Sequence, residues 1–365
     1  MRIAFLDTQE LDYTADTPYL QPLGGSQSAL CYLAAELAQL GHEVAVLNAT
    51  TLPGRYRNVQ FIHLARVPAE VLARFDFVVV LNWAYGLQLR RELGIRAPLV
   101  LWLSHAADQP VVAPLAQPEQ RDGWSGFAFV SDWQQERFIK QFRIPRDKAR
   151  VLRNAISPAF AETPLAPAWF EGEEPPVLVY TSTPFRGLDV LLLAFRIIRK
   201  EIPQLRLRVF SSMAIYQVKA AQDQYRPLYA QCIAEGVDYR GPLGQAKLAM
   251  ELRGVAGLAY PSTFAETSCI AVLEAMAAGA FIFTTRLGAL PETTNGFGYL
   301  VDAEPDPQIF AERFAAMTIK AWYELAADPA AASQRREAQA RFVRDRYRWS
   351  DRAAEWVSWL EQIAG

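Results

Sequence analysis

The sequence alternates short apolar runs with stretches of helical periodicity, and this alternation restricts the fold more than any other feature. The runs are apolar at successive positions, which is typical of parallel strands covered by helices on both faces. Five runs lie in the first half (residues 2–7, 43–48, 75–81, 98–103 and 126–131), and four in the second (176–182, 205–212, 257–262 and 281–286). Repeated βα units predict an α/β fold with doubly wound parallel sheets.

The length of 365 residues exceeds what one core comfortably supports, because domains of this class have roughly 100–200 residues each. A proline- and acid-rich segment, residues 156–176, fits neither the helical nor the strand period, so we place the domain boundary near Pro167 to Pro175. The prediction is a Rossmann-like domain over residues 1–168 and a second over 169–346, facing each other across a cleft. A final helical stretch, 347–365, carries an apolar stripe at helical spacing.

Composition excludes several function classes. The net charge is -2, with 37 basic and 39 acidic side chains, so no basic field recruits nucleic acid. The three cysteines are far apart and fit reduced thiols in a cytoplasmic enzyme. We expect no secretory signal and no spanning segment, since no apolar run approaches about 18 residues. Six arginines between 335 and 348 favour a solvated helix face. The alternative is a patch that binds an anionic acceptor or makes peripheral contact with the inner membrane surface.

The segment around residues 261–279 concentrates the candidate chemistry. A strand ends at Pro261, a polar loop follows, and we predict a helix from near Ser268 to Gly279. The crevice beyond a strand end in an open α/β sheet is a common ligand site. Amide groups at a helix N-terminus favour phosphate, so Thr267, Ser268, Cys269 and Ile270 are predicted to bind a diphosphate.

Two carboxylates flank this predicted phosphate site. Glu266 lies in the loop and Glu274 in the second helical turn. A carboxylate repels phosphate but accepts hydrogen bonds from sugar hydroxyls, and a ligand with both phosphates and diols is a nucleotide sugar. The alternative is that Glu266 complements the helix dipole and Glu274 is a surface residue.

The residues PSTFAETSCIAVLEAMAAGAFIFTTRLGALPE resemble the C-terminal signature of the family-four retaining glycosyltransferases (glycosyl transferases group 1), which have the two-domain GT-B fold. The segments FVSDWQQERF and VLRNAISPAF extend the likeness over nearly the whole chain. The resemblance implies that Glu266 contacts the transferred sugar and Glu274 the nucleotide ribose. It also implies that the helix 347–365 packs back on the first domain.

In VLVYTSTPFRGLDVLLLAF, Arg186 follows a strand and precedes an amphipathic helix, which makes it a candidate phosphate clamp. The family carries an arginine and, directly before a glycine, a lysine around this turn. In this chain only the position before the glycine is cationic, and Arg186 occupies it. The residue that makes the other diphosphate contact is therefore unassigned. An arginine at a helix start is unfavourable for the dipole, which disfavours a purely surface role.

Two first-half positions complete the predicted site. Gly24 and Gly25 precede a long helix that we expect Ser26 to cap, and adjacent glycines permit close backbone approach. The resemblance implies that this loop approaches the donor phosphate. His105 follows a very apolar strand, at a sheet edge where clefts form, and the resemblance favours a contact to the transferred sugar. His42 and His63 are interpreted as structural.

These assignments predict a retaining, metal-independent hexosyltransferase in bacterial glycan or glycoconjugate biosynthesis. The resemblance implies that the leaving phosphate takes the acceptor proton, with Arg186, Glu266 and His105 as the groups acting in the step. We expect no cofactor, because the nucleotide-diphosphate sugar is a co-substrate, and no metal site. Another GT-B enzyme (an epimerase or phosphorylase) and a non-catalytic sugar-nucleotide-binding homologue are the alternatives.

The acceptor is left open between a glycan, a lipid-linked sugar and a protein. Tyr13, Tyr19 and Trp83 in the first half are candidates for stacking on a sugar, with ordinary packing as the competing interpretation of each. Tyr239, Arg240 and Pro242 follow a short run in the second half and are candidates for the border of a base pocket, with ordinary packing as an equal alternative.

Overall fold

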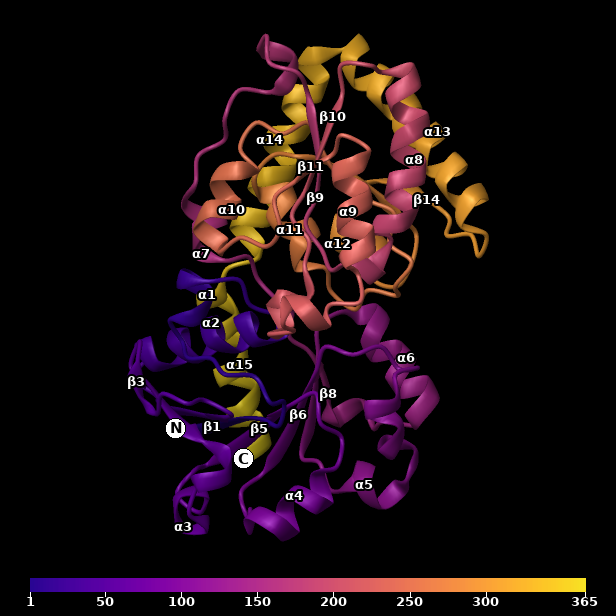
Figure 1. The fold of residues 1–365 in the computed structure, drawn as a ribbon. Coiled ribbons are helices and arrows are strands. Elements are labelled where there is room, and N and C mark those ends of the chain that lie inside the picture. The colour runs from indigo at the N-terminus through magenta and orange to yellow at the C-terminus, as the bar shows by residue number, and fades with distance from the viewer. The chain divides into compact units, whose positions relative to one another are not determined.

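The computed structural model describes residues 1–365, the side chain of Ala69 excepted. The chain forms two compact units (Figure 1). Unit 1 contains Met1–Ala155 and Trp349–Gly365, and unit 2 contains Ile156–Arg348. Each unit is built on one sheet with helices on its faces, so the α/β fold with two Rossmann-like units is confirmed.

Unit 1 has an eight-stranded sheet in the order β3-β4-β2-β1-β5-β6-β7-β8. β3 pairs antiparallel with β4, and the other described pairs are parallel. Phe5 of the first strand faces Val46 on one side and Val79 on the other. The strands are β1 (Arg2–Asp7), β2 (Glu43–Asn48), β3 (Gly54–Tyr56), β4 (Val59–His63), β5 (Phe77–Leu81), β6 (Leu99–Leu103), β7 (Gly126–Phe129) and β8 (Ala149–Val151).

The helices of unit 1 cover both faces of this sheet and bury its fully apolar central strands, as the uninterrupted hydrophobic runs predict. They are α1 (Thr17–Leu20), α2 (Gly25–Gln39), α3 (Ala69–Leu72), α4 (Gly86–Leu93), α5 (Pro118–Asp122), α6 (Asp132–Phe142) and α15 (Trp349–Ala364), with 3-10 turns at Leu64–Arg66, Pro110–Ala116 and Arg146–Lys148.

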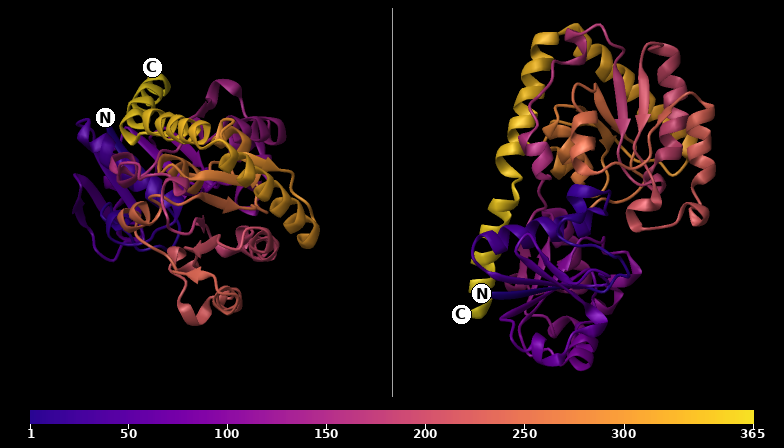
Figure 2. Two further views of the ribbon diagram at one scale, coloured as in Figure 1. Left: turned by 90° about the horizontal axis from the view of Figure 1, so that it is seen from above. Right: turned by 60° about the vertical axis from the view of Figure 1, so that its left-hand side comes forward.

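The C-terminal helix α15 belongs to unit 1, and both chain ends lie on this unit (Figure 2). α15 packs on α2. Trp356, which is 1% exposed, contacts Trp102 of β6 and Phe5 of β1 edge to face, with ring centroids 5.3 and 6.4 Å away. The apolar stripe of the final helix is therefore core material, since aromatic burial of this extent is a large stabilising contribution.

Unit 2 has a six-stranded parallel sheet in the order β11-β10-β9-β12-β13-β14. Its strands are β9 (Val177–Tyr180), β10 (Arg206–Val209), β11 (Asp238–Tyr239), β12 (Gly257–Tyr260), β13 (Phe281–Thr285) and β14 (Tyr299–Val301). Its helices are α7 (Pro158–Glu162), α8 (Leu188–Glu201), α9 (Arg226–Ala234), α10 (Gln245–Glu251), α11 (Ile270–Ala277), α12 (Leu290–Thr294), α13 (Pro307–Ala327) and α14 (Pro329–Arg346), with 3-10 turns at Trp169–Glu171, Pro184–Arg186, Met213–Tyr216 and Ala220–Gln222.

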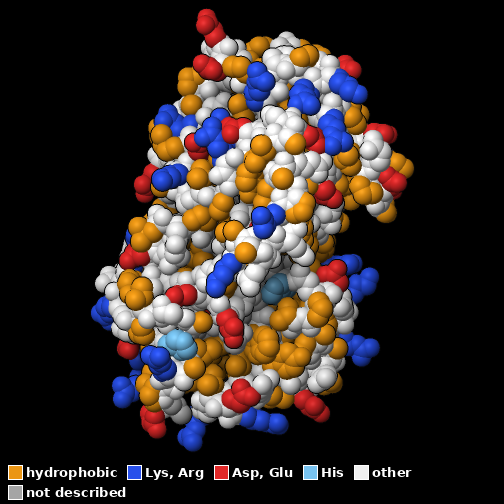
Figure 3. Space-filling view, in the orientation of Figure 1, with side chains coloured by type: hydrophobic (Ala, Val, Ile, Leu, Met, Phe, Trp, Pro, Cys, Tyr) orange, Lys and Arg blue, Asp and Glu red, His pale blue; other side chains and the backbone are white. Residues whose placement is uncertain are grey.

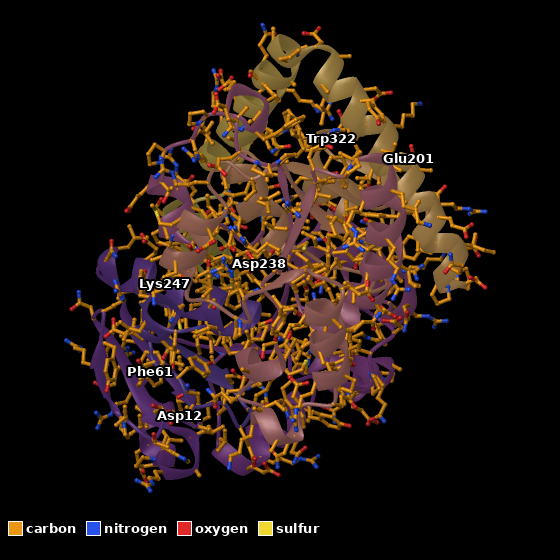
Figure 4. All side chains as sticks on the ribbon, turned by 45° about the horizontal axis from the view of Figure 1, so that its top comes forward. Asp12, Phe61, Glu201, Asp238, Lys247 and Trp322 are labelled. Atoms are coloured by element: carbon orange, nitrogen blue, oxygen red, sulfur yellow. The ribbon has the colours of Figure 1, made fainter. Side chains whose placement is uncertain are left out.

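The long helix α13 packs along α8, and the Tyr323 hydroxyl donates to the carbonyl of Glu201 at the end of α8. Figure 4 labels Glu201 and the neighbouring Trp322 on these two helices. Trp322 also stacks on Trp169 with ring centroids 4.0 Å apart, which fastens the proline-rich segment to unit 2.

The predicted boundary at residues 168 and 169 differs from the division in the structure, where residues 156–168 belong to unit 2. Backbone contacts that composition does not reveal hold this segment there. The N–H of Ile156 donates to the carbonyl of Tyr347, and the guanidinium of Arg344 donates to the carbonyl of Thr163.

The arginine-rich helix α14 is not solvated along its whole face, contrary to the favoured interpretation. Arg336 is 7% exposed and donates to the carbonyls of Gly279 and Ala166. Arg344 donates to the carbonyl of Ala277 at the end of α11. These guanidinium groups satisfy the C-terminal carbonyls of α11 and complement its dipole, so they anchor the helix that carries Glu274.

Candidate functional site

The strand order of each sheet reverses direction at one place, and open α/β sheets bind ligands beyond the carboxyl ends of the strands at that place. In unit 2 the reversal lies between β9 and β12. The loop after β9 carries Arg186, and the loop after β12 carries Glu266. In unit 1 the reversal lies between β1 and β5, and the loop after β1 leads to Gly24 and Gly25.

Arg186 and Glu266 form an ion pair in unit 2. Nη1 of Arg186 lies 2.5 Å from Oε1 of Glu266, and the Tyr260 hydroxyl donates to the same oxygen. Glu266 is 3% exposed. The Arg186 guanidinium also lies over the Phe264 ring, 4.6 Å from its centroid. A buried carboxylate held by two donors is a fixed hydrogen-bond acceptor, which suits recognition of a hydroxyl group.

One donor of Arg186 is unused by the described residues, because its Nε is buried without a hydrogen-bond partner there. Burial acts to lower the pKa of Arg186, but the Glu266 carboxylate outweighs this effect and the pKa is raised well above its ordinary value. The side chain is therefore a permanent cation. A buried N–H without a partner at the carboxyl edge of the sheet is available to an external acceptor, such as a phosphate oxygen.

Two glycines make the close approach of these loops possible. Gly187 has a φ of +106°, and a Cβ atom there would lie 2.0 Å from the carbonyl oxygen of Pro261. Gly288 has a φ of +61°, and a Cβ atom there would lie 2.3 Å from the carbonyl oxygen of Glu266. The next residue, Ala289, donates its N–H to that same carbonyl at 2.7 Å. The Glu266 loop is thus held by backbone contacts that are possible only because glycine occupies positions 187 and 288.

The predicted helix start near Ser268 is wrong by two residues. α11 begins at Ile270, with Cys269 as its N-cap in an extended conformation. Cys269 is buried and its backbone is extended, so the chain has not yet entered the helix at this residue. Among the four residues predicted to bind phosphate, only Ile270 belongs to the first helical turn.

Glu274 is buried within unit 2 and is not a surface residue, which removes that alternative. It is 4% exposed, and its Oε1 accepts a hydrogen bond from the N–H of Ser157 at 3.3 Å. Burial raises the pKa of Glu274 to about 8, against the opposing effects of the Ser157 N–H and the Gln245 side chain. The carboxyl is therefore largely protonated at neutral pH and can donate as well as accept hydrogen bonds.

Gly24 is the N-cap of α2 and Gly25 its first residue, so the prediction that Ser26 caps the helix is wrong. No side chain caps the helix, because a glycine occupies the cap position. The loop before it is held by a buried network that sequence reasoning missed. The Asp7 carboxylate, at the end of β1, accepts from the Tyr13 hydroxyl at 2.8 Å and from the Gln27 amide at 3.1 Å. Burial raises the pKa of Asp7.

His105 follows the carboxyl end of β6 in unit 1, as expected from its position after an apolar strand. Two carboxamides hold its backbone. The Gln134 side chain donates to the carbonyl of His105 at 2.8 Å, and the Asn82 side chain accepts from the N–H of Ser104 at 2.6 Å. Buried amides that bond to the backbone in this way make a loop rigid, which is what a ligand contact requires.

The other two histidines have local partners. His42 contacts the N-terminal amine at 3.1 Å, and the His63 ring accepts from the N–H of Ala65 at 3.2 Å. Among the predicted site residues, Arg186 and Glu266 contact each other, and Glu274 lies in the same unit. Gly24, Gly25 and His105 belong to unit 1.

Tyr239 also acts locally in unit 2, where its hydroxyl donates to the carbonyl of Ser211 and its ring stacks on Tyr229. Within the described part of the chain, no group of three or more histidine, cysteine or acidic side chains is arranged to hold a metal ion. No helix among the described residues is both long and apolar enough to cross a bilayer.

Comparison with known proteins finds a family model that matches a segment of unit 2, which includes Arg186, Glu266 and Glu274. Residues 175–318 match the family model described as glycosyl transferases group 1. A segment covering 35% of the chain is 31% identical, over 134 residues, to D-inositol 3-phosphate glycosyltransferase of Streptomyces scabiei. That match spans 30% of the length of the relative.

Two solved structures match over nearly the whole chain. A glycosyltransferase from Rickettsia africae has a TM-score of 0.72 at 14% identity, with 99% of this chain and 98% of that chain covered. The Anabaena protein HepE in complex with UDP-glucose has a TM-score of 0.66 at 18% identity, with 98% and 99% covered. At this identity the likeness shows the fold, which is that of GT-B glycosyltransferases.

Proposed function

We propose that this chain is a member of glycosyl transferases group 1, whose family model matches residues 175–318, and that it transfers a sugar from a nucleotide-diphosphate donor to an acceptor hydroxyl. The observation that carries the proposal is the Arg186–Glu266 pair at the β9/β12 reversal of the sheet. It combines a cation that has an unused donor with a fixed carboxylate, at the place where such sheets bind ligands. A phosphate group and a sugar hydroxyl match these two groups.

In the proposed donor complex, Arg186 binds the diphosphate through its unused Nε–H, and the amide of Ile270 contributes the positive end of α11. Glu266 accepts from a hydroxyl of the transferred sugar. Glu274 binds the ribose diol, and its raised pKa permits one hydroxyl to accept from the protonated carboxyl. Thr267, Ser268 and Cys269 line the approach to α11.

Unit 1 contributes the remaining proposed contacts. The loop at Gly24 and Gly25 contacts the donor phosphates, and His105 contacts the transferred sugar. The buried Asp7 network and the Gln134 amide hold these two loops rigid. Preorganised contacts of this kind lower the barrier because the protein does not reorganise as charge develops.

The proposed transfer retains the configuration of the anomeric carbon. The bond between this carbon and the leaving phosphate oxygen breaks, and a bond to the acceptor oxygen forms on the same face. The acceptor proton moves to the leaving phosphate oxygen. No enzymic nucleophile is needed, and Arg186 stabilises the negative charge that develops on the diphosphate.

We also propose that the reaction needs neither a metal ion nor a cofactor, with Arg186 and the α11 amides balancing the phosphate charge. Turnover should then be unchanged in EDTA. Loss of turnover in EDTA that a divalent ion restores would contradict this part of the proposal. The buried free thiols of Cys31, Cys232 and Cys269 fit a cytoplasmic place of action.

The test is turnover of UDP-, GDP- and ADP-sugars with a panel of glycan, lipid-linked and peptide acceptors. The expected result is a glycoside whose anomeric configuration, read by NMR, equals that of the donor. An epimerised product formed from the donor alone would show that the protein is an epimerase. Phosphorolysis of a glycan would show that it is a phosphorylase. Inversion of the anomeric centre would contradict the retaining mechanism.

A further inference from the structure

The loop after β5 in unit 1, residues 82–86, presents two aromatic side chains outward from a rigid turn. Asn82, Ala84 and Gly86 are buried, whereas Trp83 is half-buried and Tyr85 is 37% exposed. The alternation places Trp83 and Tyr85 together on the outer side of the turn. Their ring centroids lie 5.1 Å apart with an interplanar angle of 39°. We call Trp83 and Tyr85 the aromatic platform.

Two contacts and one backbone angle define the turn under this platform. Asn82 has a φ of +59°, a left-handed conformation that asparagine adopts more readily than other non-glycine residues. Its N–H donates to the carbonyl of Trp102 at 2.9 Å. A Cβ atom at Gly86 would lie 2.6 Å from the Trp124 ring, so the chain is packed directly on that ring. These contacts fix the course of the turn.

The platform adjoins the His105 loop. The Asn82 carboxamide oxygen accepts from the N–H of Ser104 at 2.6 Å. Trp83 directly follows Asn82 in the chain, and His105 directly follows Ser104. β5 is also one of the two strands at the reversal of the unit 1 sheet. The aromatic pair and the histidine are therefore parts of one strand edge, at the position where open α/β sheets bind ligands.

The charge of this edge indicates the kind of ligand. The segments 82–86 and 104–109 contain no lysine or arginine and one acid, Asp108. A phosphorylated or otherwise anionic ligand would find no cation in these two segments, in contrast to the Arg186 loop. Figure 3 shows hydrophobic side chains gathered on the visible face of unit 1, with basic side chains mostly around them. Flat aromatic faces next to amide and imidazole groups suit a neutral sugar ring.

We propose that the aromatic platform is an acceptor subsite that stacks a neutral pyranose, so that the acceptor of this enzyme is a glycan. This inference rests on the proposed glycosyl transfer and specifies the class of acceptor for that reaction. Trp83 packs its inner side on the core of unit 1, so its ring is rigid before a ligand binds. A preordered aromatic ring gains contact area at little cost in conformational entropy.

The test uses saturation-transfer NMR on the full chain, with maltose, cellobiose, lactose and N,N'-diacetylchitobiose as probes. We expect saturation of ring C–H protons of at least one probe by the unsubstituted protein. This signal should disappear in Trp83→Ala and Tyr85→Ala, return partly in Trp83→Phe, and persist in the control Tyr56→Ala on the edge strand β3. Absence of saturation for every probe, or its persistence in both alanine variants, would overturn the proposal.

Kinetics separate this subsite from the donor site. With a glycan acceptor, Trp83→Ala should raise the acceptor KM on the order of tenfold, the equivalent of one good aromatic contact. Donor KM and donor hydrolysis in the absence of acceptor should stay unchanged, which also shows that the variant is folded. An equal fall in transfer and hydrolysis indicates a structural role and overturns the proposal.

Two further outcomes keep this inference distinct from the proposed function. Transfer to a non-carbohydrate hydroxyl alone would overturn the glycan acceptor and leave glycosyl transfer standing. Sedimentation with phosphatidylglycerol vesicles that is lost in Trp83→Ala would identify the platform as a membrane contact and also overturn it. No turnover of any donor, with or without acceptor, would count against the proposed function itself.

Discussion

The two sheet reversals of this molecule occupy equivalent topological positions but carry opposite chemistry. At β9/β12 a buried ion pair, Arg186 and Glu266, lies between glycine-dependent loops. At β1/β5 the edge has amides, an imidazole and an aromatic pair, with no basic residue in segments 82–86 and 104–109. Our proposals thus assign the Arg186 loop of unit 2 to the anionic donor and the loops after β5 and β6 of unit 1 to a neutral acceptor, because the loops differ and the strands do not.

The largest expected effect comes from removing the Glu266 carboxylate at the β9/β12 reversal, which we call the charged site. Glu266→Ala should lower kcat about 10²- to 10³-fold, because it deletes a contact to the reacting sugar and leaves the Arg186 cation without its partner. Initial-rate kinetics measure the effect, with circular dichroism as a check of folding. Asp302→Ala, which removes the exposed partner of Arg286, is the matched control and should leave kcat unchanged. Near-normal turnover by a folded Glu266→Ala protein would refute the assigned role.

The second prediction concerns the close approach of loops at the charged site. Gly187→Ala adds left-handed strain of about 1–2 kcal/mol and a collision with the Pro261 carbonyl worth a further ~1–3 kcal/mol. The free energy of unfolding should fall by roughly the sum, as urea denaturation would measure. Gly236→Ala also has a positive φ but open space around its Cβ position, so it isolates the strain. Equal losses in both variants would show that the loops can move apart at no cost.

The third prediction uses the raised pKa of Glu274. Because the folded-state pKa of about 8 lies above the ordinary glutamate pKa of 4.5, the folded protein binds the proton more tightly. Stability from this group is present at low pH and is lost as pH rises toward 8. Relative to Glu274→Gln, the unsubstituted protein should lose about 2 kcal/mol between pH 6 and pH 8, from a limiting slope of about 1.4 kcal/mol per pH unit. Parallel stability curves for the two proteins would mean that Glu274 is ionised in the native state.

The smallest expected effect is in unit 1, at the end of β1. Asp7→Asn should destabilise unit 1 by about 1 kcal/mol, because one amide oxygen replaces the two carboxylate oxygens that accept from Tyr13, Gln27 and the N–H of Gln9. Hydrogen exchange should become faster in residues 8–24, the loop that Asp7 anchors, and remain unchanged in unit 2. Unchanged hydrogen-exchange rates in residues 8–24 would show that Asp7 does not anchor this loop.

Sequence reasoning identified Arg186 and Glu266 because both follow apolar runs that could only be strands of a covered sheet. The likeness to a known family added their roles. Tyr260 was missed because an aromatic residue at the end of an apolar strand looks like core, and only its hydroxyl contact to Glu266 distinguishes it. Gly288 was missed because its positive φ depends on the Glu266 loop, which is distant in sequence.

The remaining errors have the same origin in tertiary contacts. The start of α11 is later than predicted because Cys269, which is buried, has an extended backbone before the helix. Residues 156–168 read as linker by composition, yet Arg344 and Tyr347 bond their backbone to unit 2. Asn82 and Gln134 carry no sequence signal, since an amide that fixes a distant loop resembles any polar residue until its partner is known.

The central claim is that unit 2 binds a nucleoside diphosphate through Arg186 and Glu274. A thermal-shift series with UDP, GDP and ADP, on the unsubstituted protein and on Arg186→Ala and Glu274→Ala, tests this claim directly. Ligand at about 100 times its Kd stabilises the native state by ~2.7 kcal/mol, which raises Tm measurably. We predict that one of the three diphosphates raises Tm and that both substitutions diminish the shift. No shift with any of them, or an equal shift in all three proteins, would contradict the account.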